Sequence, residues 1–267
     1  MSALAQAAAD GMVVTKRNLI KIKRLPDLLI FSSIQPIMFV LLFAYVFGSA
    51  INVPGVDYKE FLMAGIFTQT VAFGSALTAV GLAEDLQKGI IDRFRSLPMA
   101  RSAVLVGRTT SDLLNNVLVV VIMSVCGLLV GWRIREGVLS AVAAYALLLL
   151  FAFAMSWVSA TIGLTVRSVE VAQSAGFIWL FPVTFLSNAF VPSERLPTVL
   201  RVIAEWNPIS AVVASLRDLF GNVGPNVPVG GSFPQQYPIV MAVGWSLLLL
   251  AIFVPLSVRR YRAAATR

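Results

Sequence analysis

Six long apolar runs limit what this chain can fold into. Each is close to the length of about 20 residues that a helix needs to cross the hydrocarbon core of a membrane. The chain is 58% hydrophobic and only 13% charged, whereas a soluble domain has about 25% charged residues. We therefore expect an all-α integral membrane protein with six transmembrane helices in a single domain over residues 1–267. The predicted spans are residues 28–50, 61–83, 113–131, 138–163, 171–190 and 239–258.

The distribution of positive charge predicts the orientation of these spans. Six spans place both termini on one side of the membrane, together with the connection over residues 84–112. Fifteen of the 21 Lys and Arg residues fall on that side and six on the other. An excess of positive charge marks the cytoplasmic side. We expect a multi-pass protein of the cytoplasmic membrane with both termini and residues 84–112 in the cytoplasm. The net charge of +8 then reflects topology and contact with membrane lipids rather than nucleic acid.

Two further segments differ from ordinary loops. Residues 1–27 include an amphipathic stretch, 12–25, which predicts a helix that lies in the cytoplasmic interface. Residues 191–237 form a long outer connection that is too polar to cross. We expect two short helices there, broken at Asn207-Pro208, which dip into the outer leaflet as re-entrant helices or pack on the outer face. Arg133, Arg135 and Glu136 are interpreted as a solvated outer turn.

The predicted spans lack ionisable residues in their interior. This disfavours an ion-coupled secondary carrier, because such proteins usually place ionisable groups in mid-membrane, although broken helices could still bind Na⁺ through backbone carbonyls. The chain also has no His and no Gly-rich phosphate loop that ends in Gly-Lys-Ser/Thr, and no Cys/His cluster for zinc. We therefore predict no catalytic residue, no metal site and no bound cofactor, so any energy must come from another subunit.

The connection over residues 84–112 contains an amphipathic pattern. Its apolar residues share one face of a helix that begins near Glu84-Asp85 and ends at Pro98. Gly89 lies in the middle, where glycine costs about 1 kcal/mol relative to Ala, which fits close approach of another backbone. The pattern fits either a helix that docks on a partner or a helix that lies on lipid headgroups. The apolar residues are Leu86, Ile90, Ile91, Phe94 and Leu97.

The run from Glu84 to Pro98, followed by Arg101 and Gly107-Arg108, resembles the cytoplasmic coupling segment of ATP-binding-cassette (ABC) type-2 permeases, especially the daunorubicin/doxorubicin-resistance branch. A second stretch is similar to the signature of these permeases, although Val183 and Ala211 depart from its usual residues. That stretch includes Leu180, Leu186-Ser187, Ala189, Leu196-Pro197, Pro208-Ile209 and Arg217.

The resemblance implies a half-transporter. Such permeases pair in the membrane with a second permease subunit, here expected to be a second copy of the chain or a paralogue. Two copies of a separate cytoplasmic ABC ATPase bind ATP and Mg, and a groove on each receives a coupling helix. The implied function is export of a hydrophobic or amphipathic molecule such as a drug, lipid or polyketide-like compound. An ion-coupled carrier and a non-transporting scaffold remain alternatives. The implied coupling residues are Glu84, Leu86, Gly89, Ile90, Arg93, Phe94 and Leu97.

Related permeases bind apolar cargo between their second and fifth spans. Here these spans carry aromatic rings and a few amides at helical spacing, a combination that suits flat, amphipathic molecules. The same rings could instead pack on lipid or on neighbouring helices. The candidate cargo residues are Gln69, Thr70 and Phe73 in the second span and Phe181, Phe185 and Asn188 in the fifth.

Overall fold

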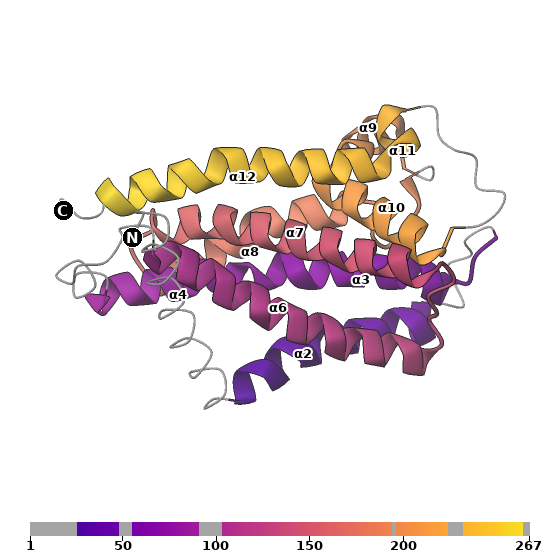
Figure 1. The fold of residues 1–267 in the computed structure, drawn as a ribbon, viewed down its shortest axis with the longest axis horizontal. Coiled ribbons are helices and arrows are strands. Elements are labelled where there is room, and N and C mark those ends of the chain that lie inside the picture. The colour runs from indigo at the N-terminus through magenta and orange to yellow at the C-terminus, as the bar shows by residue number, and fades with distance from the viewer. Residues whose placement is uncertain (1–25, 48–54, 91–102, 194–195, 224–231, 264–267) are drawn as a thin grey trace.

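The computed structural model describes residues 26–47, 55–90, 103–193, 196–223 and 232–263. These residues form a bundle of helices that run roughly along one axis, with α12 and α2 on opposite sides (Figure 1). In chain order the elements are α2 (Pro26–Leu41), the π-helical turn η1 (Leu42–Phe47), α3 (Tyr58–Gly74), α4 (Ala76–Gln87), α6 (Ala103–Val130), α7 (Val138–Gly163), α8 (Val169–Phe185), α9 (Thr198–Glu205), α10 (Pro208–Phe220), α11 (Phe233–Gln236) and α12 (Pro238–Ala263).

Four segments are long and apolar enough to cross a membrane: Tyr58–Gln87, Val104–Val130, Val138–Gly163 and Pro238–Ala263. They correspond to the predicted second, third, fourth and sixth spans. The predicted first and fifth spans coincide with shorter apolar helices, Ser33–Val46 and Val169–Phe185. Six spans are therefore not confirmed in the described residues. The number of candidate spans is four, or five if the bent pair α9 and α10 is counted as one.

The predicted span over 171–190 is shorter than expected because the chain leaves the helix after Phe185. At this end of α8, backbone carbonyls accept hydrogen bonds from the side chain of Asn207, the N-cap of α10, instead of from a further helical turn. Asn207 donates to the carbonyls of Val183, at 2.6 Å, and Leu186, at 3.0 Å. Buried carbonyls need such partners, and their presence lets α8 stop early.

The outer connection contains the two short helices that the sequence predicts. α9 and α10 meet at 70°, and the break falls at Asn207, whose side-chain oxygen accepts a hydrogen bond from the backbone N–H of Ile209. Asn at the N-cap with Pro at the first helical position is a favoured helix start. α10 contacts α3, α7 and α12, and Val212, Leu216 and Phe220 are fully buried. It therefore packs inside the bundle, not on its outer face.

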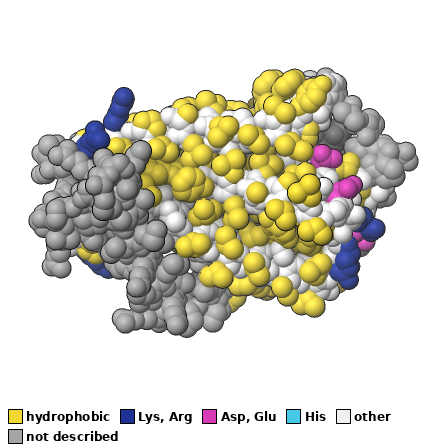
Figure 2. All heavy atoms as spheres, viewed as in Figure 1, with side chains coloured by type: hydrophobic (Ala, Val, Ile, Leu, Met, Phe, Trp, Pro, Cys, Tyr) yellow, Lys and Arg dark blue, Asp and Glu magenta, His cyan; other side chains and the backbone are white. Residues whose placement is uncertain are grey.

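The described helix ends gather at the two ends of the bundle. The end of α4, the start of α6 and the end of α12 lie at one end of the bundle, which is on the left in Figure 1. The start of α3, the α6–α7 turn and α9–α11 lie at the other end. Figure 2 shows that the described side chains between the two ends are mainly hydrophobic on the visible face, with charged groups near the ends. Which end faces the cytoplasm stays a prediction.

Small residues hold α4 tightly against α7. The hydroxyl oxygens of Ser75 and Ser159 lie 3.0 Å apart. One turn further along, a Cβ atom added to Gly163 would overlap the carbonyl oxygen of Ala79 and lie 2.8 Å from its Cα. Small residues permit this close approach of helix backbones in membranes. The half of the second span that leads to residues 84–90, which is α4, therefore packs closely against α7.

Candidate functional site

The structure places the first part of the predicted coupling segment at the end of α4. Glu84 and Leu86 belong to the last turn of this helix, which ends at Gln87, so the expectation that one helix runs from Leu86 to Leu97 is wrong. Glu84 does not sit at a helix N-terminus. It pairs instead with Lys88 just beyond the helix, and this hydrogen bond raises the pKa of Lys88 above its ordinary value.

Gly89 adopts a backbone conformation that favours glycine. Its φ is 62°, in the left-handed region that side chains with a Cβ disfavour. A Cβ added there would meet no described atom within 4 Å, and close approach of a partner's backbone stays a prediction. The glycine allows the chain to turn sharply after α4. Ile90 follows the turn, whereas Arg93, Phe94 and Leu97 lie outside the described residues.

A cavity of about 350 Å³ lies between α2, α3, α4, α6 and α8. Its volume is at the lower end of the range typical of small-molecule sites. Three of the predicted cargo residues, Gln69, Thr70 and Phe73, line it. The full lining is Gln35, Pro36, Phe39, Gln69, Thr70, Phe73, Gly74, Ala76, Leu77, Val80, Asn115, Asn116, Val119, Gln173 and Phe177.

The break between α3 and α4 contributes to this cavity. Gly74 is the last residue of α3, and Ser75 separates the two helices. A Cβ added to Gly74 would lie 3.0 Å from the side-chain oxygen of Asn116, so the glycine leaves room for the Asn116 carboxamide.

The other three predicted cargo residues lie away from the cavity lining. Phe181 and Phe185 stack on each other along α8 with ring centres 5.7 Å apart, and they are 46% and 53% exposed. Phe181 also meets Phe73 edge to face at 5.2 Å, so the rings continue from the cavity to the surface of the chain. Asn188 lies beyond α8, where its backbone N–H donates to the hydroxyl of Ser210. Contact of these residues with cargo stays a prediction.

An ion pair lies directly beside the cavity, on the side of residues 84–90. Arg108 and Asp112 are 3.4 Å apart on α6, and the hydroxyl of Thr78 donates to Asp112 at 2.6 Å. Arg108 also donates to the carbonyl of Leu77, a cavity residue. A Cβ added to Gly81 would overlap the guanidinium of Arg108, so glycine makes room for this side chain across α4.

These positions correct two expectations. α6 begins at Ala103 and not near residue 113, and α3 begins at Tyr58. Helices of the bundle therefore do contain ionisable residues, among them Glu60, Arg108 and Asp112. The pattern of apolar residues missed them because a charged residue near the end of a span ends an apolar run even where the helix continues.

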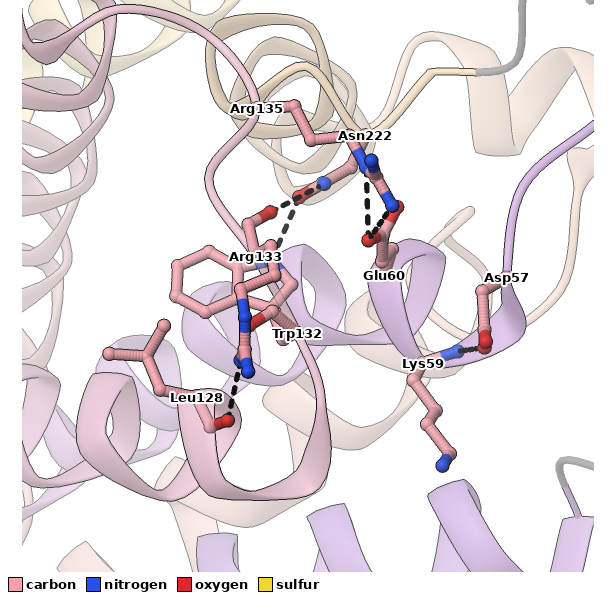
Figure 3. Close-up of polar contacts among 8 residues, drawn as sticks. All are labelled: Asp57, Lys59, Glu60, Leu128, Trp132, Arg133, Arg135 and Asn222. Atoms are coloured by element: carbon pink, nitrogen blue, oxygen red, sulfur yellow. Dashed lines mark hydrogen bonds and ion pairs between the residues drawn. The ribbon is translucent and has the colours of Figure 1, made fainter.

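The α6–α7 turn, which was predicted to be a solvated outer turn, forms hydrogen bonds and an ion pair with two other segments of the chain (Figure 3). Arg135 binds the carboxylate of Glu60 through both Nε and Nη2, with distances of 2.7 to 3.1 Å. Asn222 accepts a hydrogen bond from the Trp132 indole at 2.8 Å and donates to the carbonyl of Arg133 at 2.9 Å. Arg133, Arg135 and Glu136 are exposed, as predicted, but the turn is more than a solvated connection, because these contacts join the start of α3, the α6–α7 turn and the end of α10.

Arg217 organises the irregular chain after α8. This buried side chain, 7% exposed, donates to the carbonyls of Phe61, Asn188 and Ala189 at 2.9 to 3.1 Å. Its guanidinium lies 3.4 Å from the centre of the Phe61 ring, a favourable cation–π geometry. The residue belongs to the predicted signature stretch, and its contacts here support the backbone between α8 and α9.

A bundle of long apolar helices with a cavity lined by uncharged residues is consistent with a membrane permease. The sequence profile described as "ABC-2 type transporter" matches residues 11–220, so the chain belongs to the ABC-2 type transporter family. The resemblance drawn from residues 84–108 is thereby confirmed. Such a permease lacks the ATPase, and hydrolysis resides in a partner ABC subunit. The membrane subunits generally bind no cofactor themselves.

Relatives are similar over most of the chain. The daunorubicin resistance ABC transporter permease protein DrrB1 of Streptomyces coeruleorubidus is 33% identical over 260 residues, which cover 97% of this chain and 88% of that protein. The putative transport permease ycf38 of Cyanophora paradoxa is 24% identical over 245 residues, with 90% and 83% covered. The O-antigen export system permease protein RfbA of Klebsiella pneumoniae is 24% identical over 223 residues, with 80% and 81% covered.

Sequence reasoning missed four of the six polar side chains that line the cavity. Gln35, Asn115, Asn116 and Gln173 line it together with the predicted Gln69. A search for ionisable residues could not find them, because they are uncharged. A count of carboxamides within or beside the apolar runs would have marked all four.

Proposed function

We propose that this chain is the membrane subunit of an ATP-driven exporter that moves a hydrophobic or amphipathic small molecule out of the cell across the cytoplasmic membrane. The observation that carries the proposal is the cavity between α2, α3, α4, α6 and α8, bordered by the interrupted second span. The relatives support the direction and the class of cargo, since one is named for daunorubicin resistance and another for O-antigen export.

The proposed coupling runs through α4. The partner ATPase would contact Glu84, Leu86, Gly89, Ile90, Arg93, Phe94 and Leu97. α4 ends at Gln87 and lines the cavity with Ala76, Leu77 and Val80, so one helix joins the proposed docking region to the proposed cargo site. The turn at Gly89 sets the direction in which the following residues leave the helix.

The proposed complex contains two permeases and two ATPase subunits, with both permease termini in the cytoplasm. A homodimer is the simplest form, and a paralogue is the alternative. The exposed face of α8, which carries Ile178, Phe181 and Phe185, is the proposed surface between the two permeases and between them and cargo. Its rings reach the cavity through Phe73.

The experiment combines purification with transport. The chain is co-expressed with a candidate ABC ATPase, purified as a complex and reconstituted into vesicles, and ATP-dependent uptake of a hydrophobic dye is measured. Gly89→Ala is expected to reduce uptake several-fold, because the left-handed conformation costs a Cβ-bearing residue about 1–2 kcal/mol. Gly137→Ala is the matched control, since Gly137 has a φ of −65° and open space around its Cβ position. Arg93→Glu tests the docking charge.

The outcomes separate the alternatives. Failure to bind an ATPase, together with unchanged uptake in Gly89→Ala and Arg93→Glu, would refute the coupling. Uptake that survives without ATP and stops when ion gradients are collapsed would identify an ion-coupled carrier. A complex that takes up no compound and shows no substrate-stimulated ATP hydrolysis would identify a scaffold.

A further inference from the structure

The cavity is lined by polar side chains that form no hydrogen bond with other described residues. They come from four helices: Gln35 from α2, Gln69 and Thr70 from α3, Asn115 and Asn116 from α6, and Gln173 from α8. Within the described part of the chain, no hydrogen bond is formed by any of these side chains.

Two of these carboxamide residues are buried. Gln69 is 6% exposed and Asn116 is 3% exposed, yet their polar atoms are not among those sealed inside protein. A buried polar group without a partner costs about 1–3 kcal/mol, so buried polar groups nearly always have partners, either in the protein or outside it. In this cavity the partner must be something that enters it, either water or cargo.

The cavity is also electrically neutral. None of its lining residues in the described segments has an ionisable side chain. Among the described residues, Arg108 and Asp112 lie about one to two helical turns before Asn115 and Asn116, and they contact each other, Thr78 and the carbonyl of Leu77. A charged ligand group would find no counter-ion here, and burial of an unpaired charge is strongly unfavourable.

Aromatic rings form the apolar part of the lining. Phe73 and Phe177 lie with ring centres 5.8 Å apart, and Phe39 lines the cavity from α2. Flat aromatic molecules pack well against such rings. Carboxamides both donate and accept hydrogen bonds, so five of them suit a ligand that carries hydroxyl and carbonyl groups together.

We propose that this cavity binds an uncharged, flat aromatic molecule that carries both hydroxyl and carbonyl groups. Its rings lie against the phenylalanines and its oxygens bind Gln69, Thr70 and Asn116. This inference rests on the proposed export function and narrows its cargo. It also separates the cavity from sites for cationic drugs or anionic lipids, which would require a carboxylate or a basic side chain in the lining.

The test uses three probes that share one ring system and differ in charge. They are a dihydroxyanthraquinone, which is uncharged at the working pH, an anthraquinone sulfonate and an anthraquinone with a quaternary ammonium group. Equilibrium binding to the permease–ATPase complex in lipid nanodiscs is measured without nucleotide. The uncharged probe is expected to bind at least tenfold more tightly than either charged probe.

A matched pair of variants on α3 locates the binding. Thr70→Val removes a cavity hydroxyl and should weaken binding of the uncharged probe about fivefold, by the loss of one hydrogen bond. Thr68→Val is the control, because Thr68 bonds only the carbonyl of Ala64 in its own helix and does not line the cavity. Gln69→Met should weaken binding about tenfold. Asn116→Asp should weaken binding of the uncharged probe and shift preference towards the ammonium probe.

Opposite results would overturn the inference. They are tighter binding of a charged probe to the unmodified complex, or equal effects of Thr70→Val and Thr68→Val in variants whose thermal unfolding matches that of the parent. The binding assay requires no ATP turnover. A negative result in this assay would therefore count against the binding inference and not against the export proposal. ATP-driven uptake of other compounds without this binding pattern would refute the inference alone. The expected binding without ATP-driven transport would refute the export proposal alone.

Discussion

Replacement of Gly81 by Ala tests how the ion pair beside the cavity is held. Ala in place of a glycine inside a helix should by itself stabilise the fold by about 1 kcal/mol. Here the added Cβ would overlap the guanidinium of Arg108 and displace it from the carbonyl of Leu77 and from Asp112. Loss of a hydrogen bond from a charged donor costs about 1.5–3 kcal/mol. The difference between these two effects is a net destabilisation of about 0.5–2 kcal/mol.

Thermal unfolding of the purified protein in detergent measures this effect. For a chain of this size, about 1 kcal/mol corresponds to a shift in Tm of about 2–4 °C, so Gly81→Ala should lower Tm by about 1–8 °C. Gly244→Ala is the control, since a Cβ at Gly244 meets no described atom within 4 Å, and it should leave Tm unchanged or raise it. In an Arg108→Met background, Gly81→Ala should no longer be destabilising. The reasoning is refuted if Gly81→Ala stabilises as Gly244→Ala does, or if its cost persists without Arg108.

Three further substitutions have defined expected effects, each measured by thermal unfolding against Gly244→Ala. Gly163→Ala should destabilise by about 1–3 kcal/mol, because the new Cβ meets the backbone of Ala79, which cannot swing aside as a side chain can. Arg135→Met should lower Tm by leaving the buried Glu60 carboxylate unpaired, and Glu60→Gln added to it should restore part of the loss; no restoration would contradict the pairing. Asn207→Asp should cost at least 2 kcal/mol, since it replaces two N–H donors by oxygens that face carbonyls; an unchanged Tm would show that those hydrogen bonds do not matter.

The sequence predicted best those features that depend on local composition. The span over 138–163 coincides with α7, which has the same first and last residues, because apolar residues continue up to polar turns at both ends. The break at Asn207-Pro208 was also predicted, since a capping residue followed by Pro marks a helix start wherever it occurs.

Features that depend on contacts between distant residues could not be predicted in this way. The charges of Arg108 and Asp112 made the third span look shorter in the sequence than α6 is in the structure. Both residues remain within the helix, where they contact each other and Asp112 accepts a hydrogen bond from Thr78. The glycine at position 89 indicated a position that favours a residue without a side chain. The sequence did not show whether the reason was close approach of another backbone or a positive φ. Four carboxamides that were not predicted to bind cargo line the cavity together with Gln69. They come from three other helices, so no pattern within a single helix indicates that they lie close together.

The site itself was predicted in part. Gln69, Thr70 and Phe73 line the cavity because one helix face carries them all. Phe181, Phe185 and Asn188 do not, since α8 turns only Gln173 and Phe177 towards it. The orientation of a helix about its own axis depends on its neighbours, and a sequence read one span at a time does not contain that information.

Asn207 links the end of one helix to the beginning of another. Its two N–H groups satisfy carbonyls at the end of α8 that are 21 and 24 residues earlier in the chain, while its oxygen begins α10. These carbonyls would otherwise be left unpaired among apolar groups, a cost of several kcal/mol each in a membrane. During synthesis, α8 can therefore reach its final length only when α10 has packed. Insertion of the fifth apolar segment and closure of the outer end of the bundle should occur as one cooperative step.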